Sequence, residues 1–199
     1  MPSKVEAHIG IDYGSKMAGT TVIASADEHG QIVFTQSQKK QDADKMIETW
    51  LSQHPIKMVF IDAPLSLPLV YKTGAPEGNY FYRKADQELR AMSPMFLGGL
   101  TARAMRLKAQ LGQQNCQLFE VYPGQLAKHL GLSPDLYKKD KSNIADLTED
   151  LINNFSLSLV KIPENWHQFD ALLAYISGLR FSKQEHLAFG ESSEGLIII

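Results

Sequence analysis

Four carboxylates interrupt or end apolar segments of the sequence, where an unpaired charge is costly to bury. Three fall in strand-like runs and one opens a helix-like run: Asp12, Asp62, Glu120 and Asp170. One divalent cation can compensate several carboxylates at once, and oxygen ligands without thiolates select Mg²⁺ or Mn²⁺. We therefore predict that these four residues are catalytic and bind metal.

A carboxylate cluster of this kind suits two-metal hydrolysis of a phosphodiester bond. Two cations about 4 Å apart activate the attacking water and stabilise the leaving oxygen of an in-line displacement. The carboxylates need only hold and neutralise the ions, so the chemistry requires no serine–histidine–aspartate triad and no reactive cysteine. The pattern indicates a metal-dependent nuclease, a hydrolase of nucleic-acid phosphodiester bonds.

Structural explanations exist for each acid taken singly. A turn, a strand end or a helix start would account for Asp12, Asp62 and Asp170 in that order. Glu120 is harder to explain by packing, because Phe119 and Val121 flank it in a short strand. Four separate structural explanations at once are less expected than any single one, so the sequence favours a shared site.

The elements around these acids predict a mixed sheet. Three strands joined by short turns should form an antiparallel meander: residues 5–12, 18–26 and 31–35. A helix over 42–54 precedes a fourth strand over 57–62, which can pair parallel to the first through a right-handed crossover. Asp12 and Asp62 would then lie at the carboxyl ends of neighbouring strands, where ligands bind in open α/β sheets.

The rest of the chain predicts a fifth strand over 117–122, a loop-and-helix insertion at about 63–112 and a small C-terminal hairpin. Further helices are expected at residues 82–92, 100–111, 123–130, 142–154 and 165–181. Long loops leaving the active end of a sheet are often functional. The small residues that share a face with Asp170 predict that the last helix lies close on the sheet. No linker divides the chain, so we expect a single domain over 1–199.

The composition is that of an ordinary globular protein, with 44% hydrophobic and 21% charged residues among 199. A net charge of -2 argues against a protein that coats nucleic acid through a global positive field. Residues 83–108 nevertheless hold six basic against two acidic residues, and Lys138-Lys139-Asp140-Lys141 forms a second basic cluster. From charge alone, solvated helix faces are the simpler explanation of both.

The sequence lacks a signal-peptide pattern and any apolar run near the ~20 residues that span a bilayer, so we expect a cytoplasmic protein without a membrane partner. Cys116 is its single cysteine, which excludes an internal disulfide and a thiolate zinc site. We interpret Cys116 as a small core residue.

Five motifs occur in order and together resemble one family: Ile9-Gly10-Ile11-Asp12, Ile61-Asp62-Ala63-Pro64, Arg83-Lys84-Ala85-Asp86, Phe119-Glu120-Val121-Tyr122-Pro123 and Phe169-Asp170-Ala171-Leu172. The chain resembles the predicted RNase H-like nucleases grouped as domain of unknown function 429, from about residue 7 to its end. The resemblance implies a ribonuclease H-like α/β fold, a five-stranded mixed sheet with helices on both faces, and metal-dependent cleavage of nucleic acid. The start of the chain is also similar to Holliday-junction-resolvase-like proteins of that fold.

The resemblance also implies basic residues that bind substrate phosphate. Arg83, Asp86 and Arg90 match a family helix and share one face, so that Asp86 could bridge both guanidinium groups. A phosphate clamp and a structural row of ion pairs are equally good interpretations. Lys141 lies near a family lysine, but the arginine expected further along is missing from 143–147.

His167 lies one helical turn before Asp170 and could move a proton near a metal-bound water. A surface or core histidine outside the site is the preferred interpretation. Trp166 could stack on a base, but we favour a core position.

Two other function classes stay open. An aspartate and glycine after the first strand, followed by Gly19-Thr20-Thr21, also resemble the phosphate-binding hairpin of actin-like ATPases and kinases, although 199 residues supply one lobe where those proteins need two. A non-catalytic binding module on the same fold is the second alternative. The sequence does not distinguish DNA from RNA or a small nucleotide, endo- from exonuclease action, or one oligomeric state from another.

Overall fold

The computed structural model of the protein describes residues 8–199. Its strands are β1 (His8–Asp12), β2 (Val22–Ala26), β3 (Ile32–Gln36), β4 (Met58–Asp62), β5 (Gln117–Val121), β6 (Ala188–Glu191) and β7 (Gly195–Ile198). Its helices are α1 (Ala43–Gln53), α2 (Val70–Thr73), α3 (Lys84–Leu89), α4 (Pro94–Leu97), α5 (Gly99–Gly112), α6 (Pro123–His129), α7 (Asn143–Phe155) and α8 (Trp166–Ser182). Residues 5–7, predicted as the start of the first strand, lie outside the described part.

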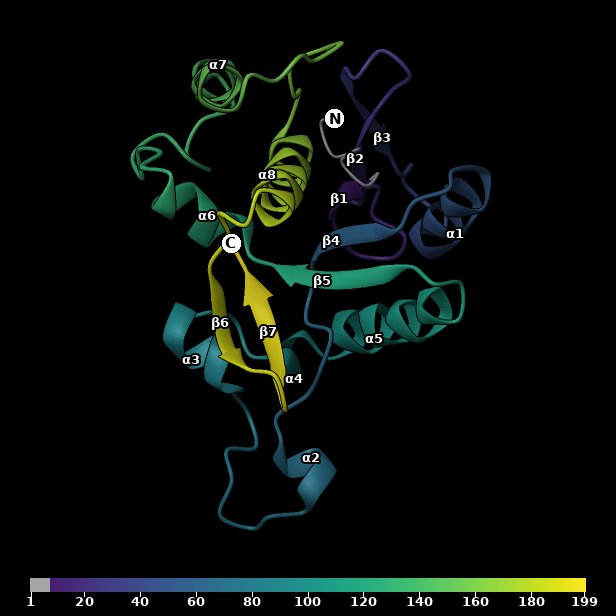
Figure 1. Cartoon of the computed structure of the whole chain (residues 1–199), viewed down its shortest axis with the longest axis vertical. Helices are drawn as coiled ribbons and strands as arrows, with labels where there is room; N and C mark the ends of the chain where they lie inside the picture. Colours follow the sequence, from purple (N-terminus) through teal and green to yellow (C-terminus); the bar gives the residue numbers. More distant parts are fainter. Residues whose placement is uncertain (1–7) are drawn as a thin grey trace.

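The predicted meander and its parallel extension are confirmed (Figure 1). Strand β2 pairs antiparallel with both β1 and β3, while β4 pairs parallel with β1 and β5. Helix α1 makes the crossover, and the Asp42 carboxylate caps it by accepting from the amides of Asp44 and Lys45. In the parallel pairing Asp12 lies opposite Asp62.

The prediction of a five-stranded sheet is wrong, because within residues 8–199 the sheet has seven strands in the order β3-β2-β1-β4-β5-β7-β6. The predicted C-terminal hairpin exists as β6 and β7, and β7 also pairs parallel with β5. Without the hairpin, β5 would be an edge strand with unpaired backbone groups. Helix α8 leads to the hairpin, which then pairs with the open edge of β5. Local sequence patterns do not reveal this pairing.

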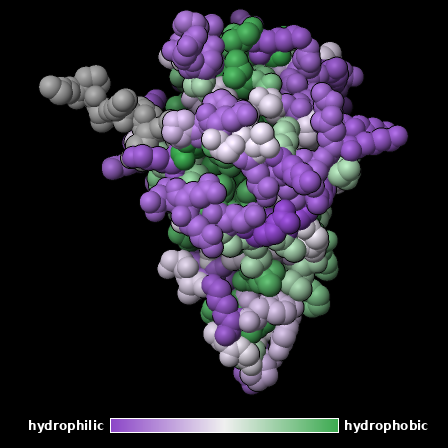
Figure 2. Space-filling view, turned by 90° about the vertical axis from the view of Figure 1, so that its right-hand side faces the viewer, coloured by the Kyte–Doolittle hydropathy of each residue, from purple (hydrophilic) through white to green (hydrophobic). Residues whose placement is uncertain are grey.

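The segment between β4 and β5 holds four helices, two of which were not predicted. Helices α2 and α4 have four residues each, too few to show a helical period. Helix α3 is shorter than the predicted 82–92, because Arg90 adopts a left-handed backbone with φ 51° directly after it. The segment projects from the sheet, with α2 and its loop at the tip in Figure 1. In Figure 2 this lower part shows more apolar and neutral surface than the strongly hydrophilic upper part.

Helices cover both faces of the sheet, as expected. One core cluster joins β2 side chains to α6, α7 and α8, and the other joins β1 and β4 to α1 and α5. Trp166 packs against the first cluster, in agreement with the predicted core position. Cys116 is buried in the second, and burial raises the pKa of its thiol, as expected of a core residue. None of the helices in the described range is long and apolar enough to cross a membrane.

Helix α8 lies unusually close to β1, which sets the position of Asp170. A Cβ atom on Gly10 would stand 2.1 Å from the backbone nitrogen of Tyr175 and 2.5 Å from the carbonyl oxygen of Ala171. A Cβ atom on Gly178 would likewise stand 2.2 Å from the ring of His8. The predicted close contact between the small face of this helix and the sheet is therefore confirmed.

Replacing Gly10 with Ala is expected to destabilise the protein by about 3 kcal/mol, because backbone atoms of α8 cannot yield as a flexible side chain would. Urea denaturation measures the change. Gly99→Ala is a suitable control, since a Cβ atom there meets nothing within 4 Å and should alter stability by less than about 1 kcal/mol. Equal stability of the Gly10→Ala variant and the wild type would contradict the close packing.

Candidate metal centre

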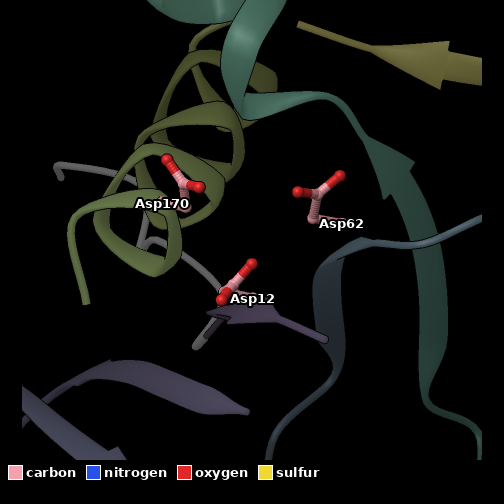
Figure 3. A group of neighbouring side chains, drawn as sticks. All are labelled: Asp12, Asp62 and Asp170. Atoms are coloured by element: carbon pink, nitrogen blue, oxygen red, sulfur yellow. The ribbon is translucent and has the colours of Figure 1, made fainter. Parts of the chain in front are cut away.

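Three of the four predicted carboxylates meet at one end of the sheet. Asp12 ends β1, Asp62 ends β4 and Asp170 projects from the first turns of α8 (Figure 3). One carboxylate oxygen of each lies within 4.8 Å of the other two. Asp12 and Asp170 are buried and Asp62 is partly buried. Three hard oxygen donors at this spacing fit a divalent cation such as Mg²⁺ or Mn²⁺.

Strand alternation explains why these side chains face one another. Successive side chains of a strand point to opposite faces, and Ile9 and Ile11 of β1 belong to the core beneath α1 and α5. Gly10 and Asp12 therefore face α8. Asp62 is the register partner of Asp12 and points the same way. Helix α8 begins above that end of the sheet and supplies Asp170.

The carboxylate of Asp62 has no hydrogen-bond partner among residues 8–199. Burial, followed by the negative charges of Asp12 and Asp170, raises its pKa well above the ordinary value. The fold therefore holds an acid without a hydrogen-bond donor against two others of the same charge, and the nearby Lys138 offsets this repulsion in part. A cation bound between them would remove this cost.

Asp12 has a partner at one carboxylate oxygen, and Asp170 has a partner at each. Asp12 Oδ2 lies 2.8 Å from Nδ1 of His167, and this hydrogen bond raises the pKa of the histidine. The sequence favoured a position of His167 outside the site. In the structure its side chain, which is 44% exposed, contacts Asp12 instead. Its position one turn before Asp170 was the sequence signal that places it beside the carboxylates, and its role in proton movement stays a prediction.

Asp170 is contacted by two residues that the sequence did not connect with the site. The hydroxyl of Tyr137 donates to Oδ1 at 2.7 Å, and Nζ of Lys138 lies 2.6 Å from Oδ2. Burial raises the pKa of Asp170 and outweighs the lowering by Lys138. Both partners come from the turns between α6 and α7, where the sequence shows only a basic cluster.

Glu120 is not part of the close group, contrary to the four-carboxylate prediction. Its Oε1 accepts from Nη2 of Arg83 at 2.6 Å, and its Oε2 accepts from Nη1 of Arg83 and from the amide of Leu65. In the sheet Glu120 lies opposite Ile61, so it points to the face opposite that of Asp62. Its side chain therefore points away from the face of the sheet on which the three aspartates meet.

Arg83 is a structural ion-pair residue, so the interpretation of this side chain as a phosphate ligand is wrong. It is 0% exposed, and all five of its side-chain N–H groups donate within the chain, to Asp86, Ser66 and Glu120. The predicted bridge to Arg90 is absent from the hydrogen bonds of the described residues, because Arg90 follows the end of α3 and is exposed. Lys141 is also exposed, and a phosphate-binding role for these two exposed cations stays a prediction.

Two more cations of the basic 83–108 stretch have an acidic partner within the chain. Arg103 and Arg106 both pair with Asp44, whose carboxylate also accepts from the hydroxyl of Tyr13. Nη1 of Arg103 donates to the carbonyl of Gly14 at 3.0 Å. This network fixes the turn that follows Asp12, and the charge of Asp44 offsets part of the positive charge of the two arginines.

A cleft of about 330 Å³ opens beside the carboxylates. Asp12, Asp62 and Glu120 are among the residues that line it. Its walls are largely apolar and include residues of the β4–β5 segment: Pro64, Ala91, Met92, Leu97 and Leu100. The predicted insertion therefore forms a wall of the site.

No protein-family model matches the sequence, and no curated protein matches it. Among solved structures, the chain is similar to the yeast mitochondrial Holliday junction resolvase Ydc2, with 12% sequence identity and a TM-score of 0.48. The match covers 91% of this chain and 80% of that chain. A likeness at this level assigns neither a family nor an activity to the chain.

Proposed function

We propose that this protein is a divalent-cation-dependent phosphodiesterase of ribonuclease H-like architecture that hydrolyses nucleic acid. The observation that carries the proposal is the unpartnered carboxylate of Asp62, held within 4.8 Å of two further carboxylates. The fold gains nothing from this repulsion, so the arrangement is best explained by a bound cation. Mg²⁺ and Mn²⁺ fit a donor set of carboxylate oxygens.

The three aspartates would hold the cation or cations at the mouth of the cleft. A bound divalent cation supplies an activated water and charge stabilisation of the scissile phosphate. His167 contacts Oδ2 of Asp12 and so orients that carboxylate, leaving its other oxygen free to ligate. The apolar walls of the cleft restrict access of bulk water to the carboxylates.

The charge distribution supports a substrate recognised by local structure. The net charge is -2, and three arginines of the basic stretch are paired within the chain: Arg83, Arg103 and Arg106. At least half of the six basic residues of that stretch are therefore engaged within the chain, which weakens the stretch as a binding surface for successive phosphates of a duplex. We also propose that the protein is cytoplasmic and is one of the nucleases grouped as domain of unknown function 429.

Calorimetric titration with Mn²⁺ tests the metal centre directly. We expect saturable binding to the wild type and at least ~10-fold weaker binding to Asp12→Asn, because one anionic ligand of three is removed. Asp135→Asn removes an exposed carboxylate from a surface turn and should bind as the wild type does. Glu120→Gln should also leave the ligand set intact, since Glu120 pairs with Arg83.

A nuclease assay on duplex, single-stranded and branched DNA and RNA follows with the same variants. Turnover that requires Mn²⁺ or Mg²⁺ and is lost in Asp12→Asn would support the proposal. Metal binding without turnover on the whole panel would favour a non-catalytic module. Absence of Mn²⁺ binding by the wild type at millimolar concentrations would contradict the metal centre.

A further inference from the structure

We infer that Lys138 is a built-in counter-ion of the metal centre, which a divalent cation displaces from Asp170 and which then serves the phosphate of the substrate. The inference rests on the proposed function and adds a positioning residue to it. It also predicts that one side chain weakens metal affinity and supports turnover at the same time.

The contacts of Asp170 leave no unshared oxygen for a cation. Tyr137 bonds Oδ1 and Lys138 lies 2.6 Å from Oδ2. A cation that binds Asp170 therefore approaches an oxygen that already has a partner, and the positive charge of Lys138 opposes it. The distribution of contacts identifies which partner gives way.

Tyr137 is the fixed partner of the two. Its ring packs against Trp166 and Phe169 of α8, with centroid distances of 5.6 Å and 6.0 Å. The Lys138 side chain is 49% exposed, whereas that of Asp170 is 4% exposed. The ammonium group can therefore leave Asp170 and enter water, while moving the phenol would disrupt the core beside α8.

The backbone at Lys138 has an unfavourable conformation. Its φ angle is 58°, in the left-handed region that a residue with a Cβ atom adopts only at a cost. The residue lies in the turns between α6 and α7, outside both helices. The ion pair with Asp170 helps to offset this cost while no cation competes.

Charge decides the exchange in favour of the divalent ion. The ammonium group of Lys138 contacts one of the three carboxylates, whereas a divalent ion held among them would bring twice the charge close to all three. Once displaced, the flexible lysine side chain stays tethered at the edge of the cation site. A phosphate bound to the cation would then lie within its reach, and an ammonium group is a suitable partner for it.

Replacing Lys138 with Met is expected to have opposite effects on two measurements. Removing the competitor should tighten Mn²⁺ binding by about fivefold to tenfold in calorimetry. Removing the phosphate contact should raise the KM for the nucleic-acid substrate by about tenfold. A merely structural lysine would weaken both properties or neither, so the opposite signs are diagnostic.

Lys139→Met is the matched control, because it removes the same charge from the exposed neighbouring residue. It should change Mn²⁺ affinity by less than twofold, which separates a specific exchange from general electrostatics. Lys138→Gln provides a second variant in case the methionine disturbs folding, and circular dichroism verifies the fold of each protein.

Three results would overturn the inference. Weaker or unchanged Mn²⁺ binding by both Lys138 variants would show that the lysine does not compete. An equal gain in affinity with Lys139→Met would show that only net charge matters. If wild type and variants alike bind no Mn²⁺, the proposed function fails together with the inference, whereas the first two results leave the proposed function standing.

Discussion

Replacing Asp62 with Asn is expected to stabilise the metal-free protein while abolishing Mn²⁺ binding and phosphodiesterase activity. The carboxylate of Asp62 has no donor among residues 8–199 and faces Asp12 and Asp170. Removing its charge ends the repulsion and at the same time removes a metal ligand. We expect activity to fall by at least ~1,000-fold, which corresponds to about 4 kcal/mol of transition-state stabilisation.

The stability gain of Asp62→Asn is expected to be about 1 kcal/mol, or a rise of roughly 2–4 °C in Tm for a chain of this size. Differential scanning calorimetry in the presence of EDTA measures it. Adding Mn²⁺ should raise the Tm of the wild type and leave that of Asp62→Asn unchanged, because binding to the folded state alone stabilises it. Asp135→Asn is the control and should respond to Mn²⁺ as the wild type does.

The gain should depend on pH with a definite sign. Burial and the two neighbouring charges raise the pKa of Asp62 in the folded protein above the ordinary 3.8. The folded state therefore holds this proton more tightly than the unfolded chain does, and the free energy of unfolding falls as pH rises from about 4 through the raised pKa. Asp62→Asn should lack this decline. A metal-free variant less stable than the wild type at pH 7 would contradict the repulsion.

Replacing Arg83 with Met is expected to cost about 3–5 kcal/mol of folding stability, the largest loss from a single change considered for this chain. All five N–H groups of the guanidinium donate within the chain, and the carboxylates of Asp86 and Glu120 depend on it for compensation. The substitution would leave both acids buried and unpaired. Urea denaturation should show a lower midpoint, and Tm should fall by roughly 10 °C.

Two further variants make the Arg83 result specific. Adding Glu120→Gln to Arg83→Met should recover part of the loss, since it removes one of the stranded charges. Arg90→Met removes an exposed arginine from the same segment and should change stability by less than about 0.5 kcal/mol. If Arg83 instead held substrate phosphate, Arg83→Met would fold with normal stability and lose only substrate affinity.

Local patterns in the sequence determined most of the strands and longer helices and three carboxylates of the candidate metal centre. The β-rich runs, the helical period over 42–54 and the strand that follows it were enough to place Asp12 and Asp62 side by side at the carboxyl ends of parallel strands. The small residues after Asp170 predicted its helix against the sheet. These features depend on spacing within one element or on a single short crossover, which a sequence displays.

The faces of the strands and the long-range partners were decided only by the tertiary structure. In β5 the residues next to Glu120 are apolar and helices cover both faces of the sheet, so the sequence does not show which face Glu120 occupies, and its pairing with Arg83 was hidden. Tyr137 and Lys138 reach Asp170 across 32 or more residues from a turn without a motif. The pairing of the terminal hairpin with β5 was hidden as well. Such contacts depend on packing between segments that are distant in the chain.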